Sequence, residues 1–577
     1  IDWLKRPASQ AILAQALPAT PGYPRALDIL VVDEVHQCAP SGVGKYATDS
    51  LRTTTIRGLA PHFEHRLFLS ATPHNGYRES FTALLELLDP QKFARGVEPN
   101  EAELRRSVVR RLKSTMRADP VLGVRPDGTP RFTERVLTDL PVAYPDDERR
   151  AHELLAAYTK ARRKRLAGRP RETSSLDFVT VMLKKRLFSS PEAFAKTLAV
   201  HRATIERAGR FDASAQAAAT GTVATAGPAT AGTAAATGTA APGTATAGST
   251  TTGTAATDRT FAATLARPLD EDFADDDEAL RATEDALVAT AAGLGAPTAA
   301  ERALLDQLQA WADDAAGRPD AKTAELMAKI DHWLRPKGRW TDERLIIFTE
   351  YRDTQNWLHR LLLESGIDND RVDLLYGGMD PDAREQVKRN FQADPAGDPV
   401  RILLATDAAS EGIDLQRHCR RMVHLEIPWN PNRLEQRNGR IDRHLQPYAQ
   451  VFISHFVSAD YEAAPAGSLD ADLQFLALVA RKVEQIRDDL GSVGQVLSDQ
   501  VSEAMLGRRR GLDTEALASQ RNARAKRQLA AFERDLRERM MALHDRLDDY
   551  RADLGLTPEA VERAVNVGLV LGRQSPL

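Results

Sequence analysis

Amide and guanidinium side chains recur at short intervals late in the chain, at Gln436, Arg437, Arg440 and Arg443. The segment predicts a helix from Arg433, and residues four and three positions apart on a helix share a face. Gln436, Arg440 and Arg443 have this spacing. Because a planar guanidinium group donates paired hydrogen bonds to multiply charged anions, such a face favours binding of a group like a triphosphate.

Acidic side chains follow an apolar run near the start of the chain. The run Leu27–Val32 reads LDILVV and ends in Asp33 and Glu34. Open α/β sheets bind ligands outside the carboxyl ends of their parallel strands, so we expect these carboxylates at a ligand-binding edge of a buried strand. A second strand is predicted to end in hydroxyl side chains, within the sequence RLFLSAT at 66–72.

Five short sequences resemble motifs of superfamily 2 helicase-like ATPases, in the form used by the SNF2 group. DEVH (33–36) resembles motif II, SAT (70–72) motif III and RLIIFTEYRDT (344–354) motif IV. TDAASEGIDLQ (406–416) and QRNGRIDR (436–443) resemble motifs V and VI. The sequence EIPWNPNRLEQRNGRIDR is similar to the corresponding sequences of a bacterial branch of this group. That branch includes the RNA-polymerase recycling ATPase and the SNF2-like helicase of DISARM phage defence. The series DEVH–SATPHNGY–FTALLELLD favours the DISARM member.

This resemblance implies a motor that binds ATP and Mg²⁺ between two lobes. Asp33 would hold Mg²⁺, and Glu34 would orient and activate the attacking water. Arg440 and Arg443 would act as arginine fingers that reach the nucleotide from the opposite lobe. Closure of the lobes and hydrolysis would then be linked.

The resemblance also implies roles for residues around this centre. The nucleotide would be lined by Gly412, Asp414 and Gln436, together with Arg440 and Arg443. Coupling between nucleotide state and lobe movement would involve His36, Ser70 and Thr72. A nucleic-acid backbone would be gripped by Thr349, Thr406 and Ser410.

The order of strands and helices predicts an α/β fold with two RecA-like parallel-sheet lobes, the first one incomplete, with helical insertions and a helical C-terminal region. The expected organisation is lobe 1 with motifs II and III at 1–115, an inter-lobe strand and helical segment at 116–212, a linker at 213–257, a helical, acidic insertion at 258–335, lobe 2 with motifs IV to VI at 336–460, and a helical extension at 461–577. The linker is nearly all Ala, Thr and Gly. It is predicted to be disordered because it has little side-chain surface to bury.

Motif I, the phosphate loop, is expected upstream of Ile1, and this stretch alone is therefore expected to be inactive as an ATPase. The segment Gly42–Tyr46 does not substitute for it. A phosphate loop needs a preceding strand and a hydroxyl residue after its lysine, whereas Tyr46 follows Lys45. A second departure from the family is His444-Leu445 in place of the more usual Ile-Gly.

Composition sets broad limits. The 577 residues carry a net charge of −4, so nucleic-acid binding would depend on local patches and not on a global field. Cys38 and Cys419 have no metal-ligand spacing, which favours a reducing, cytoplasmic location. The sequence shows no apolar run long enough to span a bilayer, so no membrane partner is expected.

The favoured interpretation is an ATP-dependent DNA translocase of the SNF2 group, stimulated by duplex DNA more than by RNA and possessing defence-system partners. Two alternatives remain: a non-catalytic DNA-binding or scaffold subunit, and an RNA-polymerase-recycling or RNA helicase-type ATPase. The acidic run Asp270–Glu278 is expected to be solvated, with DNA mimicry or autoinhibition as the less favoured interpretations.

Overall fold

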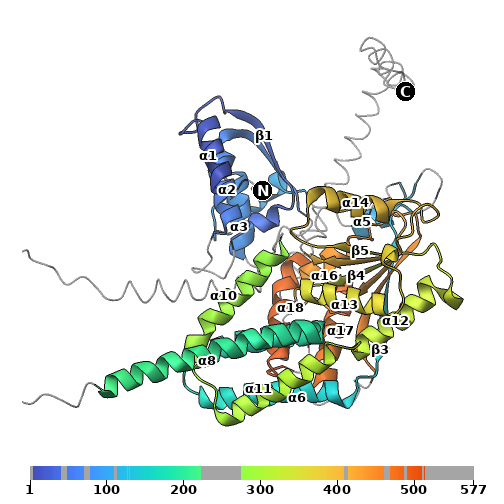
Figure 1. The fold of residues 1–577 in the computed structure, drawn as a ribbon. Coiled ribbons are helices and arrows are strands. Elements are labelled where there is room, and N and C mark those ends of the chain that lie inside the picture. The colour runs from blue at the N-terminus through green and yellow to red at the C-terminus, as the bar shows by residue number, and fades with distance from the viewer. Residues whose placement is uncertain are drawn as a thin grey trace, which may run out of the picture. The chain divides into compact units, whose positions relative to one another are not determined.

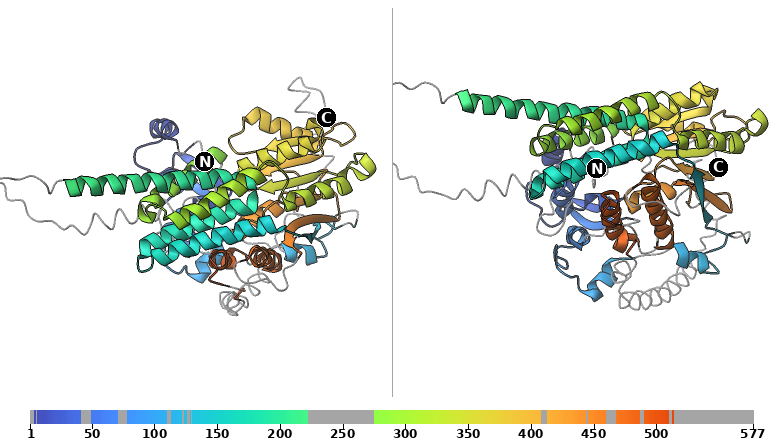
Figure 2. Two further views of the ribbon diagram at one scale, coloured as in Figure 1. Left: turned by 60° about the horizontal axis from the view of Figure 1, so that its bottom comes forward. Right: turned by 90° about the horizontal axis from the view of Figure 1, so that it is seen from below.

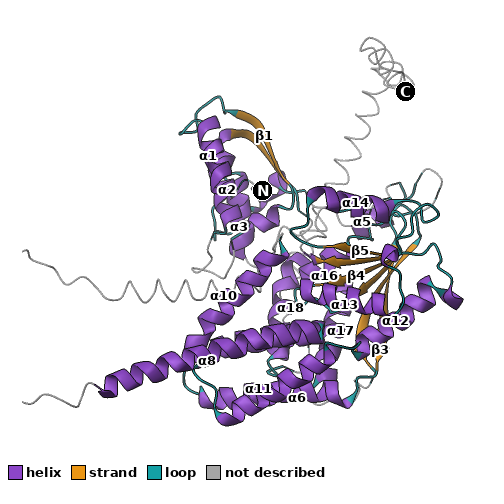
Figure 3. Ribbon diagram, viewed as in Figure 1, coloured by secondary structure: helices purple, strands orange, loops and turns teal. Residues whose placement is uncertain are grey.

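The computed structural model describes residues 4, 6–40, 49–70, 78–109, 113–121, 123–125, 128, 130–221, 275–407, 413–443, 445–459, 468–486, 490–509 and 512–513 (Figure 1). Helices and strands alternate along much of the chain, and the strands form parallel sheets (Figure 3). The α/β fold class is therefore confirmed. Residues 101–109, with helix α4 (Glu101–Ser107), belong to a compact unit separate from the one that holds the elements below.

The first lobe has a two-stranded parallel sheet, in which β1 (Leu27–Val32) pairs with β2 (Phe63–Phe68). Its other elements are α1 (Pro7–Ala16), η1 (Val35–Cys38), α2 (Leu51–Leu59), η3 (Ala60–His62) and α3 (Arg78–Leu88). A small core beneath the strands contains Val32, Val35, Cys38, Ile56, Leu84 and Leu87. The parallel pairing was predicted, but the expectation of a buried first strand is wrong. Ile29 and Val31 are 54% and 52% exposed, because no described element covers that face of β1.

The second sheet has six parallel strands in the order β3-β8-β7-β4-β6-β5. Their bounds are β3 (Glu134–Val142), β4 (Leu345–Thr349), β5 (Val372–Leu375), β6 (Ile402–Thr406), β7 (Arg421–His424) and β8 (Gln450–Ser458). Strand β3 pairs with β8 along its whole length, from Glu134 opposite Gln450 to Val142 opposite Ser458. A strand from far upstream of residue 336 thus completes the sheet of the second lobe.

Both faces of this sheet are buried, as expected for parallel strands. Side chains alternate along a strand, so Leu345 and Ile347 of β4 enter one core while Ile346 and Phe348 enter the other. The first core includes residues of α12 (Ala321–Leu334) and α13 (Arg352–Glu364), and the second includes residues of α14 (Pro381–Gln392). The remaining elements near the sheet are α5 (Lys113–Ala118), η4 (Pro336–Gly338), η5 (Asn369–Arg371), α16 (Pro431–Asn438), α17 (Leu469–Ile486) and α18 (Leu490–Met505).

Five long helices pack as a bundle, and the views in Figure 2 show them side by side. They are α6 (Asp146–Arg165), α7 (Pro170–Ser189), α8 (Pro191–Gly221), α10 (Asp276–Leu294) and α11 (Ala299–Ala315). Helix α8 continues to Gly221, so the expected linker does not begin at Ala213. The alanines that follow Ala213 favour helix strongly enough to extend α8 before glycine and threonine oppose it. Residues 222–257 of the expected linker lie outside the described residues.

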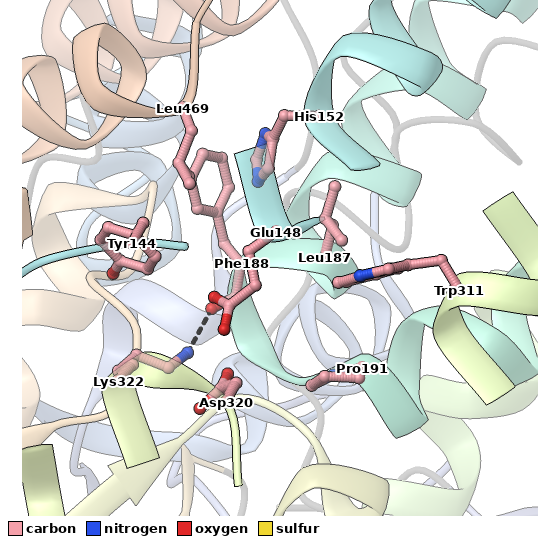
Figure 4. A pocket seen from close by; sticks show the side chains of 10 residues that line it. All are labelled: Tyr144, Glu148, His152, Leu187, Phe188, Pro191, Trp311, Asp320, Lys322 and Leu469. Carbon is pink, nitrogen blue, oxygen red and sulfur yellow. Dashed lines mark hydrogen bonds between the residues drawn. The ribbon is translucent and has the colours of Figure 1, made fainter. Parts of the chain in front are cut away.

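A small cavity of about 30 Å³ lies between helices of the bundle and a group of residues that includes Tyr144, Lys322 of α12 and Leu469 of α17 (Figure 4). In Figure 4 the carboxylates of Glu148 and Asp320 and the ammonium group of Lys322 face one another across it. Lys322 donates hydrogen bonds to the carbonyl oxygens of Phe188 (2.5 Å) and Ser189 (2.8 Å). Burial, reinforced by the charge of Asp320, raises the pKa of Glu148 to about 7. The cavity is large enough for a water molecule, and its charged lining residues are Glu148, Asp320 and Lys322.

Neither cysteine is bonded to the other, and both Cys38 and Cys419 are buried free thiols. Burial raises the pKa of Cys419 to about 12, so this thiol stays protonated near neutral pH. Within the residues given above, no helix is long and apolar enough to cross a membrane. The same residues contain no group of three or more His, Cys, Asp or Glu side chains arranged to hold a metal ion.

A chain of buried polar side chains inside the bundle includes one histidine, His201. The guanidinium group of Arg162 donates to the Tyr158 hydroxyl (3.2 Å), and that hydroxyl lies 2.8 Å from Nε2 of His201. The direction of the hydrogen bond between this hydroxyl and Nε2 depends on the tautomer of the ring. Burial and the charge of Arg162 lower the pKa of His201 to about 3.

We expect the bundle to lose stability as the pH falls, because His201 binds a proton more readily in the unfolded chain, where its pKa is near the ordinary 6.5. This contribution is fully present above pH 6.5 and declines towards pH 3, with a slope of about 1.4 kcal/mol per pH unit for one group. Chemical denaturation between pH 4 and 7 should show a shallower pH dependence for His201→Gln than for the unmodified protein. Equal slopes would contradict the assignment.

Candidate nucleotide and nucleic-acid sites

The acidic pair Asp33 and Glu34 lies in a tight turn directly after β1. The turn is held against the neighbouring strand, because the backbone N–H of Val35 donates to the Leu69 carbonyl oxygen (3.0 Å) and that of Leu69 to Val32 (2.9 Å). Glu34 has a φ of 48° and is therefore left-handed, which is uncommon for a residue other than glycine. Its N–H donates to Oδ1 of Asp33 (2.9 Å). Backbone strain of this kind costs about 1–3 kcal/mol and clusters at functional sites.

His36 connects the ends of both strands in the first lobe with the arginine-rich segment of the second. Its Nδ1 lies 3.0 Å from the Ser70 hydroxyl and 3.3 Å from Oε2 of Glu34. Its Nε2 lies 3.2 Å from Nε2 of Gln436. The amide nitrogen of Gln436 is a donor, so Nε2 of His36 is the acceptor in this contact. The predicted coupling residues His36 and Ser70 are thus joined to two residues predicted to act at the nucleotide, Glu34 and Gln436. The third predicted coupling residue, Thr72, lies outside the described residues.

The predicted helix is shorter than expected at its carboxyl end. Helix α16 begins at Pro431, where the Asn430 side chain accepts from the N–H of Asn432 (2.9 Å), and it ends at Asn438. Arg440 and Arg443 lie beyond its end, so the prediction that they share a helical face with Gln436 is wrong. Gly439 follows the last helical residue, and glycine lowers helix propensity. The N–H of Arg440 instead closes a tighter turn onto the Arg437 carbonyl oxygen (2.9 Å).

The two predicted arginine fingers have different surroundings. The Arg440 side chain is buried, with 3% of the residue exposed. Arg443 is partly exposed and donates through Nε to the Gly439 carbonyl oxygen (3.1 Å). Its guanidinium group also forms an ion pair with Asp414, so two residues expected to contact the nucleotide contact each other. Gly412 lies outside the described residues.

Arg437 lies at the centre of a buried charge cluster that the sequence did not predict. It donates to Oδ2 of Asp407 (2.9 Å) and to the Glu426 carbonyl oxygen (3.1 Å), and lies 3.6 Å from the Glu426 carboxylate. Burial lowers the pKa of Arg437, but the charge of Asp407 and its hydrogen bond outweigh this and raise it. Burial raises the pKa of Glu426 to about 7, against the opposing charge of Arg437.

A second buried acid, Glu350, links the helical bundle to α16. Glu350, which follows β4, pairs with Lys185 of α7 at 3.2 Å and with Arg433 of α16 at 3.6 Å. Burial raises the pKa of Glu350, yet the charges of Lys185 and Arg433 overcome this and hold it at about 2. The carboxylate therefore stays ionised and links three elements.

Arg135 of β3 forms ion pairs with the segment that contains Arg440 and Arg443. Its guanidinium group contacts Glu435 (2.6 Å), Asp442 (2.7 Å) and Glu484 of α17 (2.9 Å). Asp442 lies between Arg440 and Arg443, so this contact constrains both. Strand β3 reads ERVLTDLPV and carries other polar residues besides Arg135, so the sequence alone singled out neither this arginine nor its three partners.

Two of the residues expected to bind nucleic acid, Thr349 and Thr406, are buried. Thr349 is buried, and its hydroxyl donates to Oε2 of Glu426 (3.2 Å) and accepts from the N–H of Tyr351 (3.3 Å). Thr406 is also buried, and its hydroxyl donates to Oδ2 of Asp276 (2.8 Å). Ser410 lies outside the described residues. As described, both threonine hydroxyls are engaged within the protein.

Known proteins resemble part of this chain. Residues 327–444, from α12 to the arginine segment, match the helicase conserved C-terminal domain family. The uncharacterized ATP-dependent helicase YqhH of Bacillus subtilis (strain 168) is 41% identical over 102 residues, which are 18% of this chain and 17% of that protein. The ATP-dependent RNA helicase FAL1 of Kluyveromyces lactis is 31% identical over 103 residues, 18% of this chain and 24% of that protein. The chain thus spans less than a quarter of the length of these curated relatives.

Among solved structures, the SWI2/SNF2 ATPase core of Sulfolobus solfataricus in complex with dsDNA aligns with 84% of this chain and 73% of its own, at 14% identity and a TM-score of 0.33. A likeness this distant adds no argument about function. The match at 327–444 contains β4, β5, β6, β7 and α16. These residues therefore resemble the C-terminal domain of helicases.

Proposed function

We propose that this chain is part of an ATP-driven motor of the SNF2 group, which hydrolyses ATP between two lobes and moves on duplex DNA. The observation that carries the proposal is the 3.2 Å contact between His36 and Gln436. It joins the DEVH turn of the first lobe to the segment that matches the helicase conserved C-terminal domain. A chance resemblance of either motif would not require the two to meet.

The chemistry of the side chains fits ATP with Mg²⁺. Asp33 and Glu34 supply exposed or partly exposed carboxylate oxygens at the end of a parallel strand, and Mg²⁺ prefers such hard oxygen ligands. In this proposal Asp33 holds the metal ion, which neutralises phosphate charge when bound. Glu34 accepts a proton from the attacking water, and its left-handed turn fixes the carboxylate relative to Asp33.

Guanidinium groups would stabilise the negative charge that develops on the transferred phosphoryl group. Arg440 and Arg443 have this role in the proposal, with Gln436, Gly412 and Asp414 lining the nucleotide. Arg443 would exchange its ion pair with Asp414 for the more highly charged nucleotide. The Arg135 cluster holds the backbone between the two arginines, so little reorganisation is required when the nucleotide arrives.

Coupling to movement would run through His36. Its ring contacts Ser70, Glu34 and Gln436, so a change at the nucleotide alters the contact between the lobes. The sequences of motifs V and VI resemble those of SNF2-type ATPases more than those of RNA helicases, which supports duplex DNA as the nucleic acid that the motor binds. The DEVH–SATPHNGY–FTALLELLD series supports a cytoplasmic role in phage defence, alongside other proteins of the defence system.

The test is ATP turnover by the full-length natural protein with single-stranded DNA, duplex DNA or RNA added at equal nucleotide concentration. We expect duplex DNA to stimulate turnover most. Stimulation by RNA alone would favour an RNA helicase-type or RNA-polymerase-recycling ATPase, towards which the similarity to FAL1 points. Binding of DNA with no turnover under any condition would identify a non-catalytic scaffold and refute the motor.

A further inference from the structure

An aspartate from the helical bundle lies at the carboxyl ends of β5 and β6. Oδ2 of Asp276 accepts a hydrogen bond from the backbone N–H of Gly377 (2.7 Å) and another from the Thr406 hydroxyl (2.8 Å). Gly377 follows β5, and Thr406 is the last residue of β6. One carboxylate oxygen therefore takes up two donors at the edge where parallel sheets bind ligands.

The position of Asp276 is fixed by the bundle and not by the sheet. Oδ1 of Asp275 accepts from the N–H of Asp277 (2.8 Å), and its carbonyl oxygen accepts from the N–H of Ala279 (3.1 Å), so Asp275 caps α10. Further along, Ala286 and Leu287 of α10 are buried in the bundle core. The packing of α10 in the bundle core thus places its first turn at the edge of the sheet.

The surroundings of the contact have the chemistry of an anion site. Gly378 has a φ of 79°, and a Cβ added there would lie 3.0 Å from Oδ1 of Asp275, so glycine permits the close approach. The guanidinium group of Arg352 stacks 3.5 Å from the centre of the Tyr376 ring, and its charge partly offsets the rise that burial causes in the pKa of Asp276. A backbone N–H, a hydroxyl and a nearby guanidinium group are the donors that proteins present to a phosphodiester.

Burial makes the ionised form of the Asp276 carboxyl group less favourable than it is in water. Burial, helped by the charge of Asp407, raises the pKa of Asp276 to about 6 despite the two hydrogen bonds. The group is ionised near pH 7.5, yet it would be better solvated in water. A phosphodiester that brings further contacts along its backbone is therefore able to displace it.

We propose that Asp276 is an internal phosphate mimic, which occupies a backbone-binding position at Gly377 and Thr406 and must leave before nucleic acid binds there. The inference rests on the proposed function, since it regulates the same polymer-binding edge. It assigns to the first turn of α10 an autoinhibitory role, in which the helical bundle lowers the affinity of the free protein for DNA. If the docked form makes up about 90% of the free protein, the apparent affinity falls about tenfold.

The first test compares duplex-DNA affinity in the full-length protein with Asp276→Ala and with Asp285→Ala. Both substitutions remove one negative charge from α10, but Asp285 is exposed and lies away from the sheet edge. We expect Asp276→Ala to bind a fluorescent duplex about tenfold more tightly, and Asp285→Ala to bind like the unmodified protein. If both variants bound the duplex more tightly by the same factor, the change in net charge would explain the effect and the inference would be overturned.

The second test uses the unmodified protein, so it does not depend on the folding of a variant. Hydrogen exchange is measured with and without duplex DNA. We expect residues 276–282 to lose protection on binding while the peptide that contains Gly377 stays protected, because a phosphate replaces the carboxylate. Retained protection of 276–282 in the DNA complex would overturn the inference but leave the proposed function intact. Failure of both the unmodified protein and Asp276→Ala to bind duplex DNA would refute the two together.

Discussion

Replacing Glu34 with glutamine in the full-length protein is expected to lower DNA-stimulated ATP turnover by about 100- to 10,000-fold, the usual contribution of a positioned general base. Glutamine has nearly the same shape and keeps an acceptor oxygen, but it does not take a proton from water at neutral pH. The strained turn that places Glu34 after β1 should survive the change. The measurement is steady-state kcat and KM for ATP with saturating duplex DNA.

The role of Glu34 is tested by whether the loss of turnover comes from kcat or from KM for ATP. If Glu34 acts on the attacking water, kcat falls while KM for ATP changes little, because the interaction is made in the transition state. Glu64 on β2 is an exposed glutamate of the same lobe, so Glu64→Gln is the matched control and should leave both constants unchanged. A Glu34→Gln variant with normal kcat would show that the carboxylate is structural.

The strands of the second lobe were the most predictable part of the fold. Segments such as LIIFT and ILLAT are short, apolar up to a final threonine and bounded by polar residues, so local pattern alone indicates buried parallel strands. Strand β1 shows the limit of this reasoning. Its sequence is equally apolar, yet its exposure depends on what packs against it, and that is information about other parts of the chain.

The site residues divide in a similar way. The motifs single out His36, which follows β1, and Gln436, which lies in α16, and the two side chains are in contact. Long-range charge pairs have no comparable local pattern. Arg135 meets Glu435 some three hundred residues away, and Asp276 meets Thr406 across the boundary between bundle and sheet. Such pairs are set by packing geometry, which the spacing of residues in one sequence does not encode.

Replacing Arg440 with alanine is expected to lower DNA-stimulated ATP turnover by about 1,000- to 100,000-fold, the range found for arginine fingers in phosphoryl transfer. The physical reason is the loss of a fixed positive charge where negative charge develops on the phosphoryl oxygens. Arg440→Lys keeps a charge but loses the planar fork, so an intermediate value is expected. Turnover is measured as for Glu34→Gln, together with the affinity for a fluorescent ATP analogue.

Burial of Arg440 makes a purely structural role the alternative to be eliminated, and the design separates the two. An exposed arginine of the same lobe, Arg417, provides the control variant Arg417→Ala, which should behave as the unmodified protein. If Arg440 is structural, Arg440→Ala lowers the melting temperature and the affinity for the analogue along with turnover. If it is a finger, the melting temperature and duplex binding persist while kcat collapses, because the Arg135 contact with Asp442 still orders the segment. Turnover within tenfold of normal in a stably folded Arg440→Ala protein would exclude Arg440 from the chemistry and leave Arg443 as the guanidinium group to examine.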